Sequence, residues 1–312
     1  MKRSYDKFNS WKGFQEYFPE EYRINKDNKP KESYWEWEDY SVHLDRYIPK
    51  EDNKKFKIIL IHGGGGNGRL LSPLGVALCA RGYELIAPDL PGFGLTKIRK
   101  ANSYYTWVKL LDNLIDNELK NSNKGIILYG LSLGGMLAYQ VACINNKVKA
   151  LMVTSLADTR DKKVQIQLSK TKLIGTFALP MLNKLGTTID NIRIPIKITT
   201  KMWAMANNKS FVKKLLKDRV GSGSWVYLKF LRTLCEANPE IEPENFTRCP
   251  LLFIQPEKDY IIPWHISQPF YDRLACKKEF VMLEGCGHIP LEEPGINQLR
   301  EATLKFIEYL EQ

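Results

Sequence analysis

The segment GLSLGG, residues 130–135, places a serine between two glycines. It follows the apolar run GIILY and precedes MLAYQVACI, so the pattern predicts a buried strand, a sharp turn and a helix. Such a turn brings the backbone on either side of the serine close together, and Gly130 and Gly134 leave room for that approach. Ser132 would be raised at a helix N-terminus, where developing negative charge is favoured. Ser132 is therefore a candidate nucleophile.

A serine hydroxyl needs a base to take its proton, and the chain has four histidines. His43 lies in a predicted hairpin and His265 in the first turn of a predicted helix, so both are expected to be structural or surface residues. His62 is expected to shape a glycine-rich loop. His288, in EGCGHIP, follows the last apolar run on a glycine-flanked loop, which makes it the candidate general base.

The base in turn needs a carboxylate that fixes its tautomer and stabilises the imidazolium. Asp259, in FIQPEKDYIIP, follows the preceding apolar run and stands 29 residues before His288, enough for one helix and one strand. Glu257 and Asp158 are alternatives, because each also follows an apolar run. We favour Asp259 as the acid.

The loop IHGGGGNG, residues 61–68, permits two interpretations. In the first it binds a dinucleotide, because Gly63, Gly65 and Gly68 satisfy G-x-G-x-x-G and Asp89 ends the next predicted strand about twenty residues on. Glycines fill most of the loop, however, so the pattern is met almost automatically. In the second, the bare backbone donates N–H groups to a charge that exists only during a reaction.

Apolar runs and helical patterns alternate along most of the chain, which predicts an α/β fold with a doubly wound, mostly parallel sheet. A polar and aromatic alternation over residues 33–48 predicts a preceding hairpin or pair of half-exposed strands. The expected buried strands are 56–61, 83–88, 125–129, 148–154, 250–254 and 279–283. The expected helices lie near 68–81, 103–120, 133–146, 263–274 and 295–311.

One long segment, residues 158–248, shows helical patterns and no convincing strand. We interpret it as an inserted helical cap on a core formed by residues 33–157 and 249–312, with residues 1–32 as an N-terminal extension. Large apolar side chains of the cap could roof a pocket, although most are expected to form the cap's own core. They are Phe177, Met181, Met202, Trp203, Met205, Trp225, Tyr227 and Phe230.

Composition excludes several classes of function. The net charge of +11 comes from dispersed lysine pairs without a basic block, so a nucleic-acid partner is not expected. No apolar run approaches the roughly 18 residues that span a bilayer, and the N-terminus lacks the apolar stretch of a secretory signal. A cytoplasmic location is therefore expected. The six cysteines form no C-x-x-C pair, which favours free buried thiols over a zinc site or a disulfide framework.

Taken together, these motifs resemble the α/β-hydrolase superfamily, specifically its capped members, over residues 35–312. The resemblance is carried by IILIHGGGG, the turn APDLPGFGLT, the elbow GLSLGG, the acid loop and GCGHIP, in the family's order. It implies an oxyanion hole made by the N–H groups of Gly64 and Leu133, and a structural role for Asp89 in its turn. It also implies that no metal or organic cofactor is needed.

The resemblance implies an ester hydrolase acting on a small-molecule substrate through Ser132, His288 and Asp259. Dehalogenases and epoxide hydrolases of this fold use an aspartate at the elbow, so Ser132 argues against those activities. Amide, thioester or carbon–carbon bond cleavage, aminopeptidase action and cofactor-free haloperoxidation use similar constellations. A non-catalytic ligand-binding homologue is a further alternative, although such proteins often lose a triad member and none is missing here.

Overall fold

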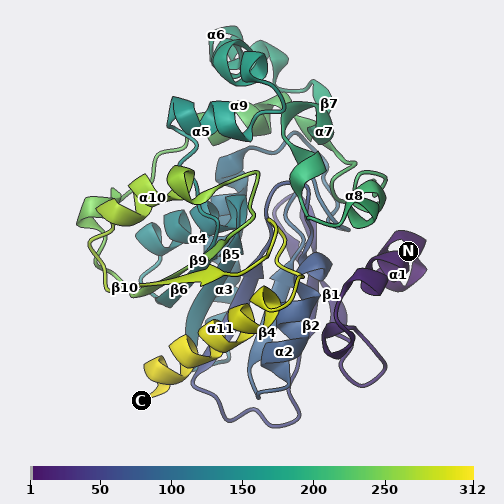
Figure 1. Cartoon of the computed structure of the whole chain (residues 1–312), viewed down its shortest axis with the longest axis vertical. Helices are drawn as coiled ribbons and strands as arrows, with labels where there is room; N and C mark the ends of the chain where they lie inside the picture. The colour runs from purple at the N-terminus through teal and green to yellow at the C-terminus, as the bar shows by residue number, and fades with distance from the viewer. Residues whose placement is uncertain (1–2) are drawn as a thin grey trace.

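An eight-stranded sheet forms the centre of the computed structural model, which describes residues 3–312 (Figure 1). Its strand order is β1-β2-β4-β3-β5-β6-β9-β10. The pairs β1–β2 and β2–β4 are antiparallel and the other five are parallel, so the predicted mostly parallel sheet is confirmed. The strands are β1 (Lys31–Trp37), β2 (Tyr40–Tyr47), β3 (Phe56–Ile61), β4 (Glu84–Pro88), β5 (Gly125–Leu131), β6 (Val148–Thr154), β9 (Leu251–Pro256) and β10 (Lys278–Leu283).

Helices cover both faces of the sheet, which explains why the central strands are apolar without alternation. In Figure 1, α2 (Ser72–Cys79) and α11 (Gly295–Glu311) pack together on the near face. On the other face α3 (Tyr104–Leu119) packs against α4 (Leu133–Ile144), and α4 contacts α10 (Trp264–Arg273) through Tyr139 and Phe270. The five helices predicted from the sequence are present, with a 3₁₀ turn, η4 (Gly68–Leu71), opening the first.

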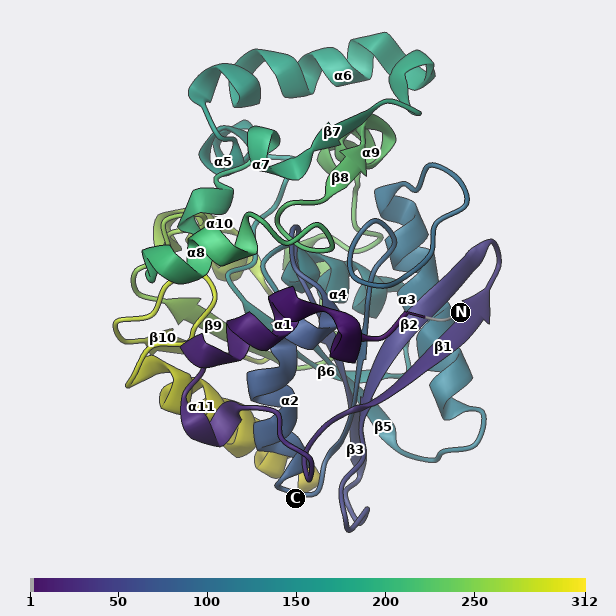
Figure 2. The ribbon, with the colours of Figure 1, turned by 90° about the vertical axis from the view of Figure 1, so that its right-hand side faces the viewer.

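The inserted segment between β6 and β9, which we call the cap segment, lies beyond one end of the sheet (Figure 2). The long helix containing α6 crosses its top. The segment's elements are α5 (Lys162–Leu168), η5 (Ile174–Ala178), α6 (Leu179–Leu185), η6 (Gly186–Ile189), β7 (Arg193–Pro195), α7 (Ile196–Thr199), η7 (Met202–Ala204), α8 (Lys209–Leu215), β8 (Trp225–Tyr227) and α9 (Leu228–Glu236). A last turn, η8 (Pro243–Asn245), leads back to β9.

The prediction that the cap segment contains no strand was wrong. β7 and β8 pair antiparallel, with Arg193 opposite Tyr227 and Pro195 opposite Trp225. Each strand has three residues, which is too short for a two-residue periodicity to be recognised in a sequence. The pair joins the two halves of the cap segment beneath α6.

The N-terminal residues connect the core to the cap segment. They form η1 (Tyr5–Lys7), α1 (Asn9–Phe14), η2 (Gln15–Tyr17) and η3 (Glu20–Tyr22). Three aromatic rings, Phe14, Tyr17 and Phe18, surround Phe211 of α8. The Lys214 ammonium, also on α8, donates to the Gly13 carbonyl at 3.2 Å. The N-terminal residues therefore hold α8 of the cap segment in place through apolar and polar contacts.

The helices and the cysteines bear on two predictions made from composition. No helix within residues 3–312 combines the length and the apolar character that crossing a membrane requires. All six cysteines are free thiols; four are buried, and Cys79 and Cys235 are partly exposed.

Candidate active site

Ser132 lies at the tight turn between β5 and α4, as the sequence predicts. Its backbone has φ +60° and ψ −122°, a strained conformation for a residue with a side chain. The Ser132 N–H donates to the Thr154 carbonyl at 2.7 Å, which ties the turn to the neighbouring strand. A Cβ at Gly130 would stand 2.2 Å from the Gly134 carbonyl oxygen, and one at Gly134 would stand 2.3 Å from that of Ile61. Both glycines are therefore required by close backbone approach.

His288 and Asp259 meet beside this turn. His288 lies on the loop between β10 and α11, Asp259 on the loop after β9, and His288 Nδ1 is 2.7 Å from Asp259 Oδ2. Both residues are buried, at 2% exposure each. With Nδ1–H donating to the carboxylate, Nε2 is the nitrogen left to accept a proton.

Asp259 is held by further donors. Its Oδ1 accepts the N–H groups of Ile261 at 2.9 Å and Ile262 at 2.8 Å, and its Oδ2 accepts the Ser155 hydroxyl at 2.7 Å. Burial alone would raise the pKa of Asp259, but attraction to His288 and the hydrogen bonds to the carboxylate outweigh burial and lower it. The side chain is therefore kept ionised and oriented toward His288.

The two alternative acids face other partners. The Glu257 carboxylate accepts the Gly285 N–H at 2.8 Å on the exposed side of the loop that carries His288. Asp158 forms an ion pair with Arg160 at 2.7 Å. Of the three carboxylates considered from the sequence, Asp259 alone is in hydrogen-bond contact with His288 among the described residues.

The glycine-rich loop lies against the serine turn, and three of its glycines are fixed by packing. A Cβ at Gly63 would stand 2.8 Å from the Leu131 carbonyl oxygen, and one at Gly68 would stand 2.6 Å from that of Ala87. Gly65 has φ +78° and directly faces the cap segment, where its Cβ would stand 2.7 Å from Met202 Sδ. These are the three glycines that satisfy G-x-G-x-x-G, so contacts within the protein account for the pattern without a dinucleotide.

The same loop presents backbone donors next to Ser132. Leu133 is the first residue of α4, so its N–H has no acceptor within the helix. A Cβ on Gly64 would lie 3.8 Å from Leu133 Cδ2, which makes the two residues neighbours. Among the hydrogen bonds recorded for residues 3–312, none uses the N–H of Gly64 or of Leu133. Both remain available to an oxyanion.

His62 shapes this loop, as predicted. Its Nδ1 donates to the Gly63 carbonyl at 2.8 Å, and its Nε2 accepts the Leu90 N–H at 3.0 Å. Burial lowers the pKa of His62, which keeps the ring neutral in this arrangement. With both nitrogens engaged, His62 is not placed to act as the base. His265, by contrast, is exposed on α10.

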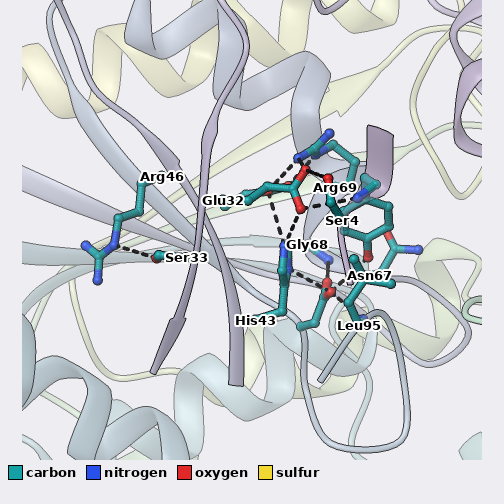
Figure 3. Close-up of polar contacts among 12 residues, drawn as sticks. Ser4, Glu32, Ser33, His43, Arg46, Asn67, Gly68, Arg69 and Leu95 are labelled. Carbon is teal, nitrogen blue, oxygen red and sulfur yellow. Dashed lines mark hydrogen bonds and ion pairs between the residues drawn. The ribbon is translucent and has the colours of Figure 1, made fainter. Parts of the chain in front are cut away.

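A buried charged cluster lies behind the loop (Figure 3). The Asp89 carboxylate accepts the N–H groups of Gly68 at 2.8 Å and Leu95 at 2.7 Å, as well as the Tyr5 hydroxyl at 2.8 Å. Its Oδ2 is also 3.0 Å from His43 Nδ1. Asp89 is fully buried, so its carboxylate is not available to a ribose. It instead fixes the end of the glycine-rich loop against β2 and the N-terminal residues.

His43 is the centre of this cluster rather than a surface residue. Its Nε2 is 3.1 Å from Glu32 Oε2. Burial lowers the pKa of His43, but the facing Asp89 and Glu32 carboxylates raise it to about 10, so the ring is protonated at neutral pH. Glu32, His43 and Asp45 are close enough to hold a metal ion. However, the Arg69 guanidinium already bonds both Asp45 oxygens, at 2.5 and 2.7 Å, and a protonated histidine is not a metal ligand.

Gly64, Ser132, Leu133 and His288 all line one cavity of about 80 Å³ between the sheet and the cap segment. The rest of its wall is almost entirely apolar. From the core it includes Ile261 and Ile262, and from the cap segment Leu168, Ile196, Met202, Met205, Phe230 and Leu234. The cavity therefore combines a polar end at Ser132 with an apolar body, which suits the acyl or alkyl part of a ligand.

The expectation that most of the apolar cap residues form the cap's own core was wrong, whereas the expectation that some of them cover a pocket is confirmed for three. Met202, Met205 and Phe230 line the cavity, whereas Phe177, Met181, Trp203 and Trp225 are exposed. Sequence reasoning missed Ser155, which donates to Asp259, because an isolated serine after a strand carries no recognisable signal. The network around His43 was missed for a similar reason, since its members come from distant parts of the chain.

Known proteins resemble the chain in both sequence and structure. Pimeloyl-[acyl-carrier protein] methyl ester esterase of Legionella pneumophila strain Corby is 31% identical over 102 residues, or 33% of this chain and 36% of the relative. The alignment thus spans about a third of that relative's length. A soluble variant of monoglyceride lipase from Saccharomyces cerevisiae has a TM-score of 0.76 at 15% identity, covering 93% of this chain and 98% of that one. Monoacylglycerol lipase of Paleococcus ferrophilus gives 0.66 at 20% identity, covering 86% and 98%.

The two structural similarities show the fold alone, because both neighbours are 20% identical to the chain or less. The family comparison extends over residues 58–296, from β3 to the beginning of α11, and so includes the serine turn, the acid loop and the histidine loop. On this match over most of its length, the chain belongs to the alpha/beta hydrolase family.

Proposed function

We propose that the protein is a serine hydrolase that cleaves a carboxylic ester of a small, partly apolar substrate. The observation that carries the proposal is the 2.7 Å contact between Asp259 and His288 at a cavity that Ser132 also lines. The arrangement joins a nucleophile, a base and an orienting carboxylate with two unused N–H groups, which is what acyl transfer requires.

In the first half of the proposed reaction, Ser132 Oγ attacks the substrate carbonyl carbon while His288 Nε2 takes the serine proton. Asp259 stabilises the imidazolium through Nδ1–H and does not itself take a proton. The tetrahedral intermediate then collapses, the ester C–O bond breaks, and His288 returns the proton to the leaving alcohol. An acyl-enzyme on Ser132 remains.

In the second half, a water molecule attacks the acyl-enzyme with His288 again acting as the base. A second tetrahedral intermediate releases the carboxylic acid, and Ser132 recovers its proton. In both intermediates the oxyanion accepts the N–H groups of Gly64 and Leu133. Each such donor contributes roughly 3 kcal/mol to transition-state stabilisation in enzymes where one has been removed.

The apolar cavity supports a substrate with a hydrocarbon acyl or alkyl group. The named relatives are in keeping with this proposal, since a methyl ester esterase and two monoacylglycerol lipases act on esters according to their names. We further propose that residues 158–248 act as a cap over a core of residues 33–157 and 249–312, with residues 1–32 as an extension. The cytoplasmic location and the absence of a nucleic-acid partner stay predictions from the sequence.

The test is a panel of p-nitrophenyl esters of increasing acyl length, measured beside aminoacyl p-nitroanilides. The wild-type protein should hydrolyse the esters, with a preference for an acyl chain that fills the cavity, and Ser132→Ala should be inactive. If the protein hydrolysed only the amides, the proposal of an esterase would be wrong and the protein would be an amidase. A folded protein inactive on every substrate would contradict the proposed function as a whole.

A further inference from the structure

The outer side of the uppermost cap helix carries a stripe of exposed apolar side chains. Leu173, Phe177, Met181 and Leu185 are four residues apart and are 70%, 67%, 58% and 45% exposed. Residues at this spacing lie on the same side of a helix. Figure 2 shows that the helix, η5 followed by α6, crosses the top of the molecule with no other element above it. Nothing within residues 3–312 covers this stripe.

Other exposed apolar side chains lie in the same part of the chain. Of the fifteen large hydrophobic residues that are exposed in the described structure, eight lie between residues 173 and 225. Beyond the stripe they are Ile192, Ile198, Trp203 and Trp225. Scattered surface hydrophobics need no explanation, but a concentration of this kind is typical of an interaction surface.

Two of the elements that expose apolar side chains, α7 and η7, also line the candidate active site. In α7, Ile196 faces the cavity while Ile198, two residues on, is 43% exposed. In η7, Met202 faces the cavity while its neighbour Trp203 is 59% exposed. At α7 and η7, a single layer of the cap segment therefore separates the apolar cavity from the exposed Ile198 and Trp203.

Most charged side chains of the segment that carries this surface are basic. Residues 168–205 contain six basic side chains and a single acidic one, Asp190. Asp190 is buried in an ion pair with Arg232 of α9 at 3.0 Å. Four of the lysines, Lys170, Lys172, Lys184 and Lys197, are exposed and have no ion-pair partner within residues 3–312. The apolar stripe is thus bordered by cationic groups that are free to meet anions.

We propose that this face of the cap segment, residues 168–205 with Trp225, docks onto an anionic lipid surface. An amphipathic helix with apolar residues on one side and lysines beside them lies in the interface of a bilayer, where the apolar side chains enter the headgroup region. The lysines then lie at the depth of the anionic headgroups, each strengthening the attraction. A tryptophan with an exposed ring adds a side chain that favours the interface.

A second copy of the chain would fit this surface less well than an anionic lipid surface does. In a twofold dimer formed by this face, the same patch would meet itself, and the lysines of one copy would oppose those of the other. Like charges brought together across an interface are unfavourable. An anionic lipid surface offers the complementary charge instead. The docking itself does not depend on the catalytic residues, so it can be tested apart from the proposed function.

The experiment is co-sedimentation of the full chain with vesicles of phosphatidylcholine alone and of phosphatidylcholine mixed with phosphatidylserine. The stripe variant Phe177→Ser/Met181→Ser is compared with Ile48→Ser/Ile144→Ser, which removes two exposed apolar side chains from the core, where they are 60% and 41% exposed. The charge variant is Lys172→Glu/Lys184→Glu. Ser132→Ala serves as the catalytically disabled control, and each variant is checked for folding by circular dichroism.

Wild type and Ser132→Ala should bind the anionic vesicles equally, and about tenfold or more tightly than the neutral ones. The stripe variant should lose about tenfold in binding to anionic vesicles, and the control double variant should change it by less than about twofold. The charge variant should lose the preference for anionic vesicles. Absence of vesicle binding by the folded wild type, or undiminished binding by the stripe variant, would overturn the proposal. Self-association abolished by the stripe substitutions, without vesicle binding, would overturn it in favour of a second copy.

Discussion

Ser155 Oγ lies 2.7 Å from Asp259 Oδ2, the same oxygen that His288 Nδ1 approaches at 2.7 Å. Ser155 directly follows β6 and has φ +57°, a strained conformation. Its hydroxyl thus positions the Asp259 carboxylate, which lies on the loop after β9. The arrangement leaves Asp259 few orientations other than the one that faces His288.

We expect Asp259→Asn to reduce kcat/KM for an ester by about 10⁴-fold, because an amide cannot hold the imidazole in the required tautomer or stabilise the imidazolium. Glu257→Gln and Asp158→Asn are matched controls, since each also replaces a carboxylate by an amide. Steady-state kinetics of the three variants decides between the acids. If Glu257→Gln or Asp158→Asn causes the large loss and Asp259→Asn does not, the assignment of the acid is wrong.

Gly65→Ala should both destabilise the fold and lower kcat. Its φ of +78° disfavours any residue with a Cβ, and the added methyl would meet Met202 Sδ at 2.7 Å and Ser222 Oγ at 3.3 Å. We expect a loss of about 1–3 kcal/mol in the free energy of unfolding. The displaced loop should also move the neighbouring Gly64 N–H away from the oxyanion.

Gly66→Ala is the control for this prediction, because the nearest atom to its added Cβ is 3.4 Å away and its φ is not positive. Urea unfolding and ester kinetics of both variants provide the measurement. Equal effects of the two substitutions would mean that the contact between Gly65 and the cap segment does not matter.

Stability should fall as the pH rises above neutrality because of His43. Its pKa is about 10 in the folded protein and roughly 6.5 in an unfolded chain. At a pH between these two pKa values, His43 keeps its proton in the folded state and has lost it in the unfolded state. The stabilisation that the protonated ring contributes is therefore fully present below pH ~6.5. It should decline by about 1.4 kcal/mol per pH unit toward pH 10.

The measurement is the free energy of unfolding by urea at several pH values from about 6.5 to 8. Above this range the cysteines add a slope of the same sign, because burial raises the pKa of their thiols in the folded protein while thiols in an unfolded chain ionise near pH ~8.5. His43→Gln, which carries no charge at any pH, should remove most of the slope. As a second readout that does not require a stable variant, the His43 ring resonances in NMR spectra should show the protonated form at neutral pH. A neutral ring at pH 7 would refute the account of this cluster.

Much of the fold could be predicted because its signals are local. Buried parallel strands appear as uninterrupted apolar runs, and the runs predicted at 56–61 and 148–154 coincide with β3 and β6. Ser132 stands in a turn whose glycines are dictated by backbone contact, so its motif could be recognised without the structure. His288 and Asp259 could be chosen because the loops after parallel strands converge at one edge of the sheet.

The features that could not be predicted from the sequence depend on contacts between distant parts of the chain. Nothing in the sequence near Tyr5 indicates that its hydroxyl bonds Asp89, or that Phe211 of the cap segment is enclosed by N-terminal rings. The division of the cap residues into cavity wall and exposed surface was equally hidden, because adjacent residues such as Met202 and Trp203 point to opposite sides of a short turn. The domain boundaries stay predictions.

The central claim is that Ser132 is a nucleophile activated by His288. Treatment with a fluorophosphonate, followed by mass spectrometry of the intact protein and of its peptides, tests it most directly. The proposed mechanism predicts a single adduct on Ser132 in the wild type, no adduct in Ser132→Ala and labelling slowed by several orders of magnitude in His288→Ala. A folded wild-type protein that stays unlabelled, or that carries the adduct at another residue, would contradict the claim.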